Sequence, residues 1–150
     1  MSANLIGRRQ IIMVRSGSAG YFYIPAGPAA GPALTSGAAN AYGSYVELED
    51  STAAALYIVG FCIDTLPANV GIDYVQFMLG TGPATETPIS EIKLGYDGLN
   101  AAGAFSYHAL PYPIPVGGTT RIAAKVADDI GSLAWNLSLM CIAQADLVAV

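Results

Sequence analysis

The chain has 150 residues, of which 53% are hydrophobic and only 11% are charged, and its net charge is −5. This length favours a single domain with a sizeable core, and high hydrophobicity with low charge excludes an intrinsically disordered chain. Six Lys and Arg residues in an acidic chain are too few for a groove that neutralises many phosphates. We therefore expect no nucleic-acid partner.

The first 19 residues form an arm in which apolar and basic side chains are mixed. Its candidate partner-binding side chains are Leu5, Ile6, Arg8, Arg9, Ile11 and Arg15. We expect this arm to be an edge strand or an extended segment that docks on a neighbouring subunit. Residues 20–150 are expected to form one domain.

Eight segments of this domain have the alternating or continuous apolar pattern of β-strands. They are residues 21–24, 45–49, 53–63, 73–79, 89–94, 105–112, 120–126 and 133–142. Residues 26–43, rich in Gly, Ala, Pro and Ser, predict a long loop, and residues 80–83 and 95–103 predict turns. No segment keeps a helical period over twelve residues. The pattern predicts an all-β, antiparallel sandwich of about eight strands, jelly-roll-like.

Alternation also predicts which side chains face the core. The expected inward residues are Val46, Leu48, Val75, Phe77, Leu79, Ile92, Leu94, Ile122, Ala124, Val126, Leu133, Trp135, Leu137, Leu139 and Cys141. Residues 53–63 are apolar on both faces, with Leu56 and Ile58 on one face and Tyr57, Val59, Phe61 and Ile63 on the other. We interpret them as a central strand covered by the other sheet on one side and by a partner subunit on the other.

The chain has few residues that could carry catalysis. His108 is the only histidine, and a single histidine near Ser106 does not define a triad, so an ordinary hydrogen-bonded histidine is the simpler interpretation. The acidic pair Asp128 and Asp129 predicts a turn; a bound cation there is an alternative, although no dense calcium loop is present. With so few His and Cys a zinc site is not expected. We predict no enzyme, cofactor or metal.

Cys62 and Cys141 both fall inside apolar strand patterns. We favour two reduced core thiols and synthesis in a reducing compartment, with a bridge open if their strands are neighbours. The charge-free stretch 16–46 is broken by repeated Gly and Pro, so no membrane helix is expected.

A surface this poor in charge is permissive for contacts between subunits, where charged residues are depleted. The chain also has nine tyrosines, a residue enriched at protein interfaces and able to stack on sugars. We favour the interface interpretation over glycan binding.

Residues 113–125, PIPVGGTTRIAAK, together with the strand around Glu91 and Ile92, resemble a β-sandwich domain of tailed-bacteriophage virion proteins. In that domain a proline-flanked aliphatic pair leads to a glycine turn and then to an R-I-A-A-[RK] strand. The prolines are expected to end ladder pairing, and Arg121 and Lys125 to face solvent or a partner. The resemblance covers residues 46–142 and brings no catalytic residues.

This resemblance implies a virion component: a capsid decoration protein, a head fibre, or a tail or baseplate domain. Our leading hypothesis is a capsid decoration protein made in the host cytoplasm. It would assemble as a homo-oligomer, with a trimer favoured, and bind the major capsid protein or other virion proteins. Tyr57, Arg121 and Lys125 join the arm as candidate partner-binding residues. The alternatives are a receptor- or glycan-binding tail domain and, on His108 alone, a hydrolase.

Overall fold

The fold is described from a computed structural model, which covers residues 12–14, 20–26, 30–65, 67, 71–83, 85–95 and 106–149. Its strands are β1 (Ile12–Val14), β2 (Phe22–Ile24), β3 (Ala33–Thr35), β4 (Val46–Glu49), β5 (Leu56–Thr65), β6 (Tyr74–Thr81), β7 (Thr87–Gly95), β8 (Ser106–Val116), β9 (Ile122–Asp128), β10 (Ala134–Ala143) and β11 (Leu147–Ala149). Within the described ranges the one helical element is η2 (Gln144–Asp146), a 3-10 turn. The predicted all-β class is confirmed.

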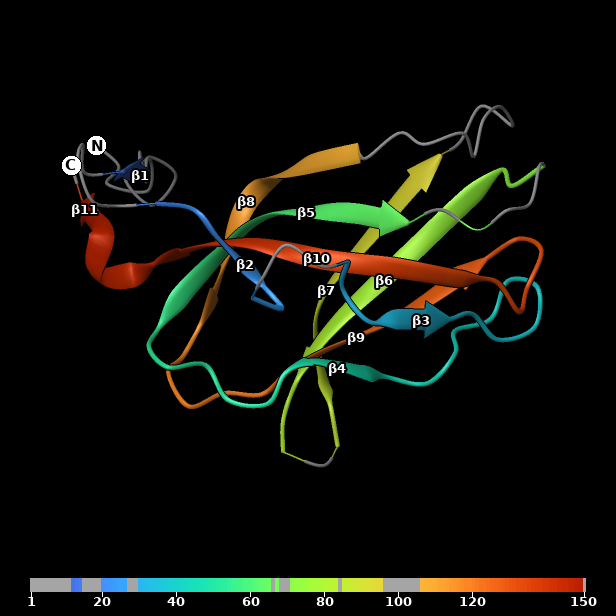
Figure 1. Ribbon diagram of the computed structural model, residues 1–150, viewed down its shortest axis with the longest axis horizontal. Helices are drawn as coiled ribbons and strands as arrows, with labels where there is room; N and C mark the ends of the chain where they lie inside the picture. Colours follow the sequence, from blue (N-terminus) through green and yellow to red (C-terminus); the bar gives the residue numbers. More distant parts are fainter. Residues whose placement is uncertain are drawn as a thin grey trace, which may run out of the picture.

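Two antiparallel sheets pack face to face (Figure 1). The five-stranded sheet has the order β2-β10-β5-β8, with β3 also pairing with β10, and the four-stranded sheet has the order β4-β9-β6-β7. The pairings are nested along the chain: β3 with β10, β4 with β9, β5 with β8, and β6 with β7. The chain is thus a long hairpin rolled upon itself, which is the jelly roll. The predicted antiparallel sandwich is confirmed, and the structure supplies the strand order, which the sequence left open.

The core lies between the sheets and is centred on aromatic rings from both of them. Phe77 of β6 meets Trp135 of β10 edge to face at a centroid distance of 6.0 Å, and Phe61 of β5 packs on Phe77 at 5.9 Å. The predicted inward side chains are buried in this core or packed against it. Strict alternation therefore predicted the core-facing side chains of β4, β6, β7, β9 and β10 correctly.

Alternation was wrong for the central strand β5, because the strand contains a β-bulge. Both neighbours of β5 skip Val59, so that Ile58 and Gly60 pair with successive ladder positions on β10. One extra residue reverses the faces of everything that follows. Phe61 and Ile63 therefore join Leu56 and Ile58 in the core, instead of lying on the opposite face as the alternation predicted.

Two further expectations need correction. The predicted loop 26–43 contains the strand β3, whose Leu34 is fully buried in the core. Residues 113–116 do not end ladder pairing, because β8 continues through the prolines and Pro115 lies opposite Tyr57. The regular pairing of β8 is interrupted instead between Ala109 and Ile114, where four residues of β8 bulge out against Val59.

One side of the sandwich is closed by the chain itself where it passes from β3 to β4. On the way, the amide of Ser36 donates to the carbonyl of Leu133 at 2.9 Å, directly before β10 of the five-stranded sheet. The amides of Asn40 and Gly43 then donate to the carbonyls of Asp128 and Val126, at 2.7 and 3.0 Å, in the four-stranded sheet. We call this segment, residues 36–43, the corner; it joins the edges of both sheets by backbone hydrogen bonds.

The corner is reinforced by Asp128, which is completely buried at the end of β9. Its carboxylate accepts a hydrogen bond from the indole Nε1 of Trp135 at 2.9 Å, across the sandwich. The same carboxylate accepts the backbone amides of Ile130 and Gly131. The predicted turn is confirmed here, and the side chain that makes it also ties the two sheets together.

Part of the predicted N-terminal arm forms β1, which pairs with β11 near the other end of the chain (Figure 1). The other arm residues, with Leu5, Ile6, Arg8, Arg9, Ile11 and Arg15 among them, lie outside the described residues. Most of the predicted turn 95–103 also lies outside them.

Candidate protein interface

Side chains that could support chemistry are dispersed. Among the described residues no group of three or more His, Cys, Asp or Glu is placed to hold a metal ion. Nor does the described part of the chain include a helix of the length and apolarity needed to cross a membrane.

Cys62 and Cys141 are free thiols, and burial raises the pKa of Cys141 to about 12. Their strands are neighbours, but Cys62 lies opposite Ser138 and Cys141 lies opposite Ile58.

The outer face of the five-stranded sheet carries a group of tyrosines. β-Sheet register places Tyr23 of β2, Met140 of β10, Gly60 of β5 and Ala109 of β8 in one row across the sheet. Tyr107 lies in the next row, opposite Cys62. We call this surface the tyrosine face; its members are Tyr21, Tyr23, Tyr57, Gly60, Cys62, Tyr107, Ala109 and Met140.

Gly60 is required at the centre of the tyrosine face. A Cβ atom at this position would lie 2.5 Å from a ring carbon of Tyr107, so the ring can lie against the strand only because Gly60 has no side chain. Burial, followed by the proximity of Tyr21, Cys62 and Tyr23, raises the pKa of the Tyr107 hydroxyl. The three tyrosines are therefore close together, although Tyr21 and Tyr107 are 86 residues apart in the sequence.

The tyrosine face is both exposed and nearly free of charge. Tyr21, Tyr23 and Tyr107 are 56%, 43% and 49% exposed. The nearby carboxylate of Asp64 is already bonded, since it accepts the amide of Gly31 at 2.9 Å and the hydroxyl of Ser138. Exposed aromatic surface without charge is the composition found at the centre of protein interfaces.

The outer face of the four-stranded sheet is different, because its charged groups are bonded to one another. Arg121 forms ion pairs with Glu47 at 2.7 Å and with Glu86. These carboxylates raise the pKa of Arg121, and Arg121 in turn lowers that of Glu86. Lys125 lies over the ring of Tyr45, with its Nζ 4.6 Å from the ring centroid.

Glu91 and the tyrosines complete this outer face. The hydroxyl of Tyr42 donates to Glu91 at 2.6 Å and the amide of Gln76 donates to the same carboxylate at 2.5 Å. Lys93 lies over the ring of Tyr74 at 4.0 Å. Burial and the hydrogen bond to Glu91 raise the pKa of Tyr42. The charged side chains named here thus interact within one chain, whereas the buried hydroxyl of Tyr45 has no hydrogen-bond partner.

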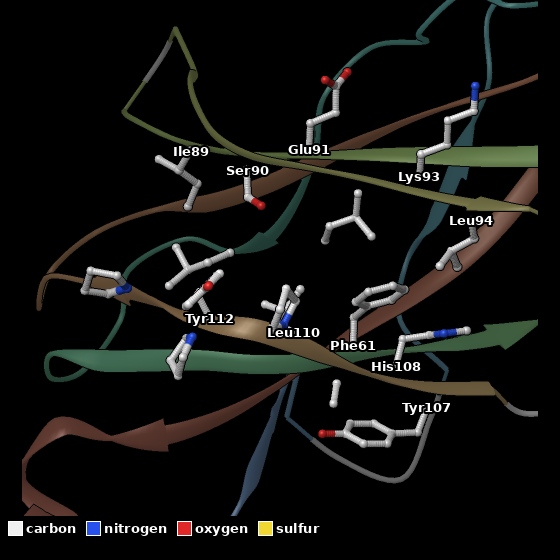
Figure 2. A pocket seen from close by; sticks show the side chains of 16 residues that line it. Phe61, Ile89, Ser90, Glu91, Lys93, Leu94, Tyr107, His108, Leu110 and Tyr112 are labelled. Atoms are coloured by element: carbon white, nitrogen blue, oxygen red, sulfur yellow. The ribbon is translucent and has the colours of Figure 1, made fainter. Parts of the chain in front are cut away.

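The sandwich is open on the side opposite the corner. A groove of about 780 Å³ lies there between β7 and β8. Figure 2 shows Ile89 and Leu94 of β7 pointing across the gap toward Leu110 of β8 and Phe61 of β5, while Glu91 and Lys93 point away from it. Ile89, Leu94 and Leu110 pack against the core but are only partly buried, whereas Phe61 is buried in it.

His108 lies in this groove, where its ring stacks on Phe61 at a centroid distance of 5.0 Å. Burial lowers its pKa below the ordinary value of 6.5. Polar side chains, among them Ser90 and Tyr112, also line the groove, and the hydrolase alternative based on His108 stays a prediction.

The structure separates the predicted partner-binding residues. Tyr57 lies on the tyrosine face, whereas Arg121 and Lys125 lie on the opposite outer face and interact with Glu47, Glu86, Tyr42 and Tyr45. Sequence reasoning recognised the tyrosines as interface candidates but did not single out Tyr21, Tyr23 and Tyr107. Their grouping depends on strand register, which the sequence pattern leaves open.

The chain is distantly similar to a viral protein of known structure. No family model and no curated protein matches the chain. Among solved structures, a chain of the infectious bursal disease virus Gx strain is similar, with a TM-score of 0.41 and 16% identity. The match covers 85% of the present chain and 33% of the viral one, so this chain spans about a third of the length of its match.

Proposed function

We propose that this chain is a non-enzymatic structural protein of a virion, which acts by covering its tyrosine face with another polypeptide. The observation that carries the proposal is the contrast between its two outer faces: one satisfies its charges internally, and the other exposes uncharged aromatic rings. Burying such rings stabilises an assembly through apolar area and through hydrogen bonds from the hydroxyl groups.

The specific role that we propose is capsid decoration. It rests on the sequence resemblance of residues 113–125 to virion β-sandwich domains, and the jelly roll is a fold used by capsid domains. Because lectin domains also use this fold, the fold alone does not decide the function. In this proposal the copies form a homo-oligomer, preferably a trimer, on the head surface. Stability is then coupled to assembly by mass action.

The tyrosine face is tested by placing a charge in its centre. In Tyr107→Glu we expect the oligomer to dissociate, with an association constant lowered by about tenfold or more. Ser44→Glu, at an exposed position beside the four-stranded sheet, is the matched control and should assemble as the unchanged protein does. Light scattering coupled to size-exclusion chromatography measures the mass, and circular dichroism confirms the fold. A Tyr107→Glu protein that assembles normally contradicts the proposal.

The arm provides the proposed contact with the capsid, through Leu5, Ile6, Arg8, Arg9 and Ile11. Removing residues 1–11 leaves β1 in place and paired with β11, so the two sheets should remain folded. We expect this truncated protein to lose binding to capsids in a co-sedimentation assay while it keeps its oligomeric mass. Full binding without the arm would remove the arm from the mechanism.

A second candidate function uses the same surface. Tyrosine rings exposed on the face of a sheet can stack on sugar rings, which favours a receptor- or glycan-binding role as the alternative. A glycan array separates the two: saturable glycan binding that Tyr107→Ala abolishes, by a protein that remains monomeric, would establish this alternative and exclude the assembly role.

A further inference from the structure

The free edge of β7 differs from the other edges of the two sheets. β8 contains Pro111, Pro113 and Pro115, which have no amide hydrogen to donate, and its pairing is interrupted by a bulge. β4 has only four residues, and the edge formed by β2 and β3 is divided into two pieces of three residues. β7 has nine residues, and no described strand pairs with its outer side. Unpaired edges of this kind can accept a further strand.

The sequence of β7 is complementary to itself when it is reversed about Ile92. In an antiparallel pair of two copies with Ile92 opposite Ile92, Glu91 of each copy lies opposite Lys93 of the other. Ser90 of each copy then lies opposite Leu94 on the groove side. The outer face of the pair gains two ion pairs, and the inner face gains an apolar centre.

We propose that two copies of this chain join β7 to β7 in this register, about a two-fold axis through Ile92, and so form one continuous eight-stranded sheet from their four-stranded sheets. Glu91 and Lys93 are both exposed and are held on the outer face by Tyr42, Gln76 and Tyr74. Their positions are therefore fixed before the copies meet, which reduces the entropic cost of forming the ion pairs.

The charges also select the register. A two-fold axis through Glu91 would place two carboxylates opposite each other, and an axis through Lys93 would do the same with two ammonium groups. Only the axis through Ile92 matches opposite charges within this part of β7. The second copy would then extend over the groove, where Ile89, Ile92 and Leu94 are only partly buried.

The sharpest test is cross-linking at the axis, carried out with the full chain. Residues opposite each other in antiparallel strands have Cα atoms about 4.5–5.5 Å apart, which a disulfide can span. We expect Ile92→Cys to form a disulfide-linked dimer on mild oxidation. Glu91→Cys, one position from the axis, is the control and should form far less, because its opposite position is Lys93. Equal yields, or no dimer from Ile92→Cys, would overturn the proposal.

Charge exchange gives an independent readout. Glu91→Lys and Lys93→Glu should each weaken dimerisation about tenfold or more, since each places like charges opposite one another. A mixture of the two variants should form a heterodimer, because every cross-strand pair is then complementary again, and the double variant should dimerise with itself. Circular dichroism checks that each variant is folded, and the cross-linking test does not depend on either of them.

This inference deepens the proposed assembly role, yet the two fail separately. If Tyr107→Glu abolishes higher assembly while Ile92→Cys still cross-links, the β7 contact stands without the tyrosine face. If Ile92→Cys forms no cross-link and the charge variants assemble as the unchanged protein does, while Tyr107→Glu is still defective, the β7 contact is wrong and the proposed function is retained. Preferential pairing of β7 with another strand, such as the arm of a second copy, would also remove the Ile92 cross-link and overturn the proposal.

Discussion

The two sides of this sandwich are closed by different means. At the corner, residues 36–43 bond to both sheets, and the buried Asp128 accepts the indole of Trp135 from the opposite sheet. At the groove, β7 and β8 meet only through partly buried side chains such as Leu110 and Leu94. The closed side holds the fold of one chain, whereas the open side leaves a strand edge and apolar surface for another chain. The tyrosine face adds a second exposed surface of this kind.

The largest effect is expected from breaking the corner. Asp128→Ala removes the acceptor of the Trp135 indole and of two backbone amides, in a site that excludes water. Leaving buried donors without partners should lower the free energy of unfolding by about 4 kcal/mol. Asp129→Ala is the control, because Asp129 accepts only the amide of Asp73 at the surface, and it should cost less than about 1 kcal/mol. Urea unfolding measures the free energy of unfolding of both variants. Similar losses in the two would show that the hydrogen bonds of Asp128 stabilise the fold no more than those of a surface carboxylate.

Matched leucines on the two sides give a smaller effect. Leu34 of β3 is completely buried beside the corner, and Leu110 of β8 is partly buried in the groove. We expect Leu34→Ala to lower the free energy of unfolding by about 3 kcal/mol and Leu110→Ala by about 1 kcal/mol. Equal values in urea unfolding would mean that the open side is packed as well as the closed one.

The groove should also respond to pH through His108. Burial lowers the pKa of His108 in the folded chain below 6.5, so the unfolded chain takes up the proton first. The contribution of His108 to stability is therefore complete above about pH 6.5 and decreases as the pH falls below that value. In His108→Gln the difference in unfolding free energy between pH 7.5 and pH 5.5 should be smaller. An unchanged difference would show that His108 is protonated equally well in both states.

The sequence was enough to predict the fold because its strands obey simple alternation. In β6, for example, Val75, Phe77 and Leu79 alternate with more polar positions, so they share one face of the strand and that face must be buried, whichever strands pair with β6. It was not enough for β5, since the extra residue at Val59 has no local signal. Nor was it enough for β3, because Leu34 is the only large aliphatic side chain in residues 26–43. The tyrosine face was hidden for another reason: Tyr23 and Tyr107 meet only through the register of β10, β5 and β8.

The smallest effect on folding should come from Tyr112, at the interruption in β8. Tyr112 is 81% exposed, so Tyr112→Ala should change the free energy of unfolding by less than about 0.5 kcal/mol. Tyr112 also lines the groove, which the second copy would approach if β7 pairs with β7. We therefore expect the same variant to weaken dimerisation, measured by sedimentation equilibrium, while its urea midpoint stays constant. A large loss of stability would show instead that Tyr112 helps to close the groove within one chain, and that the open side is part of the folded monomer.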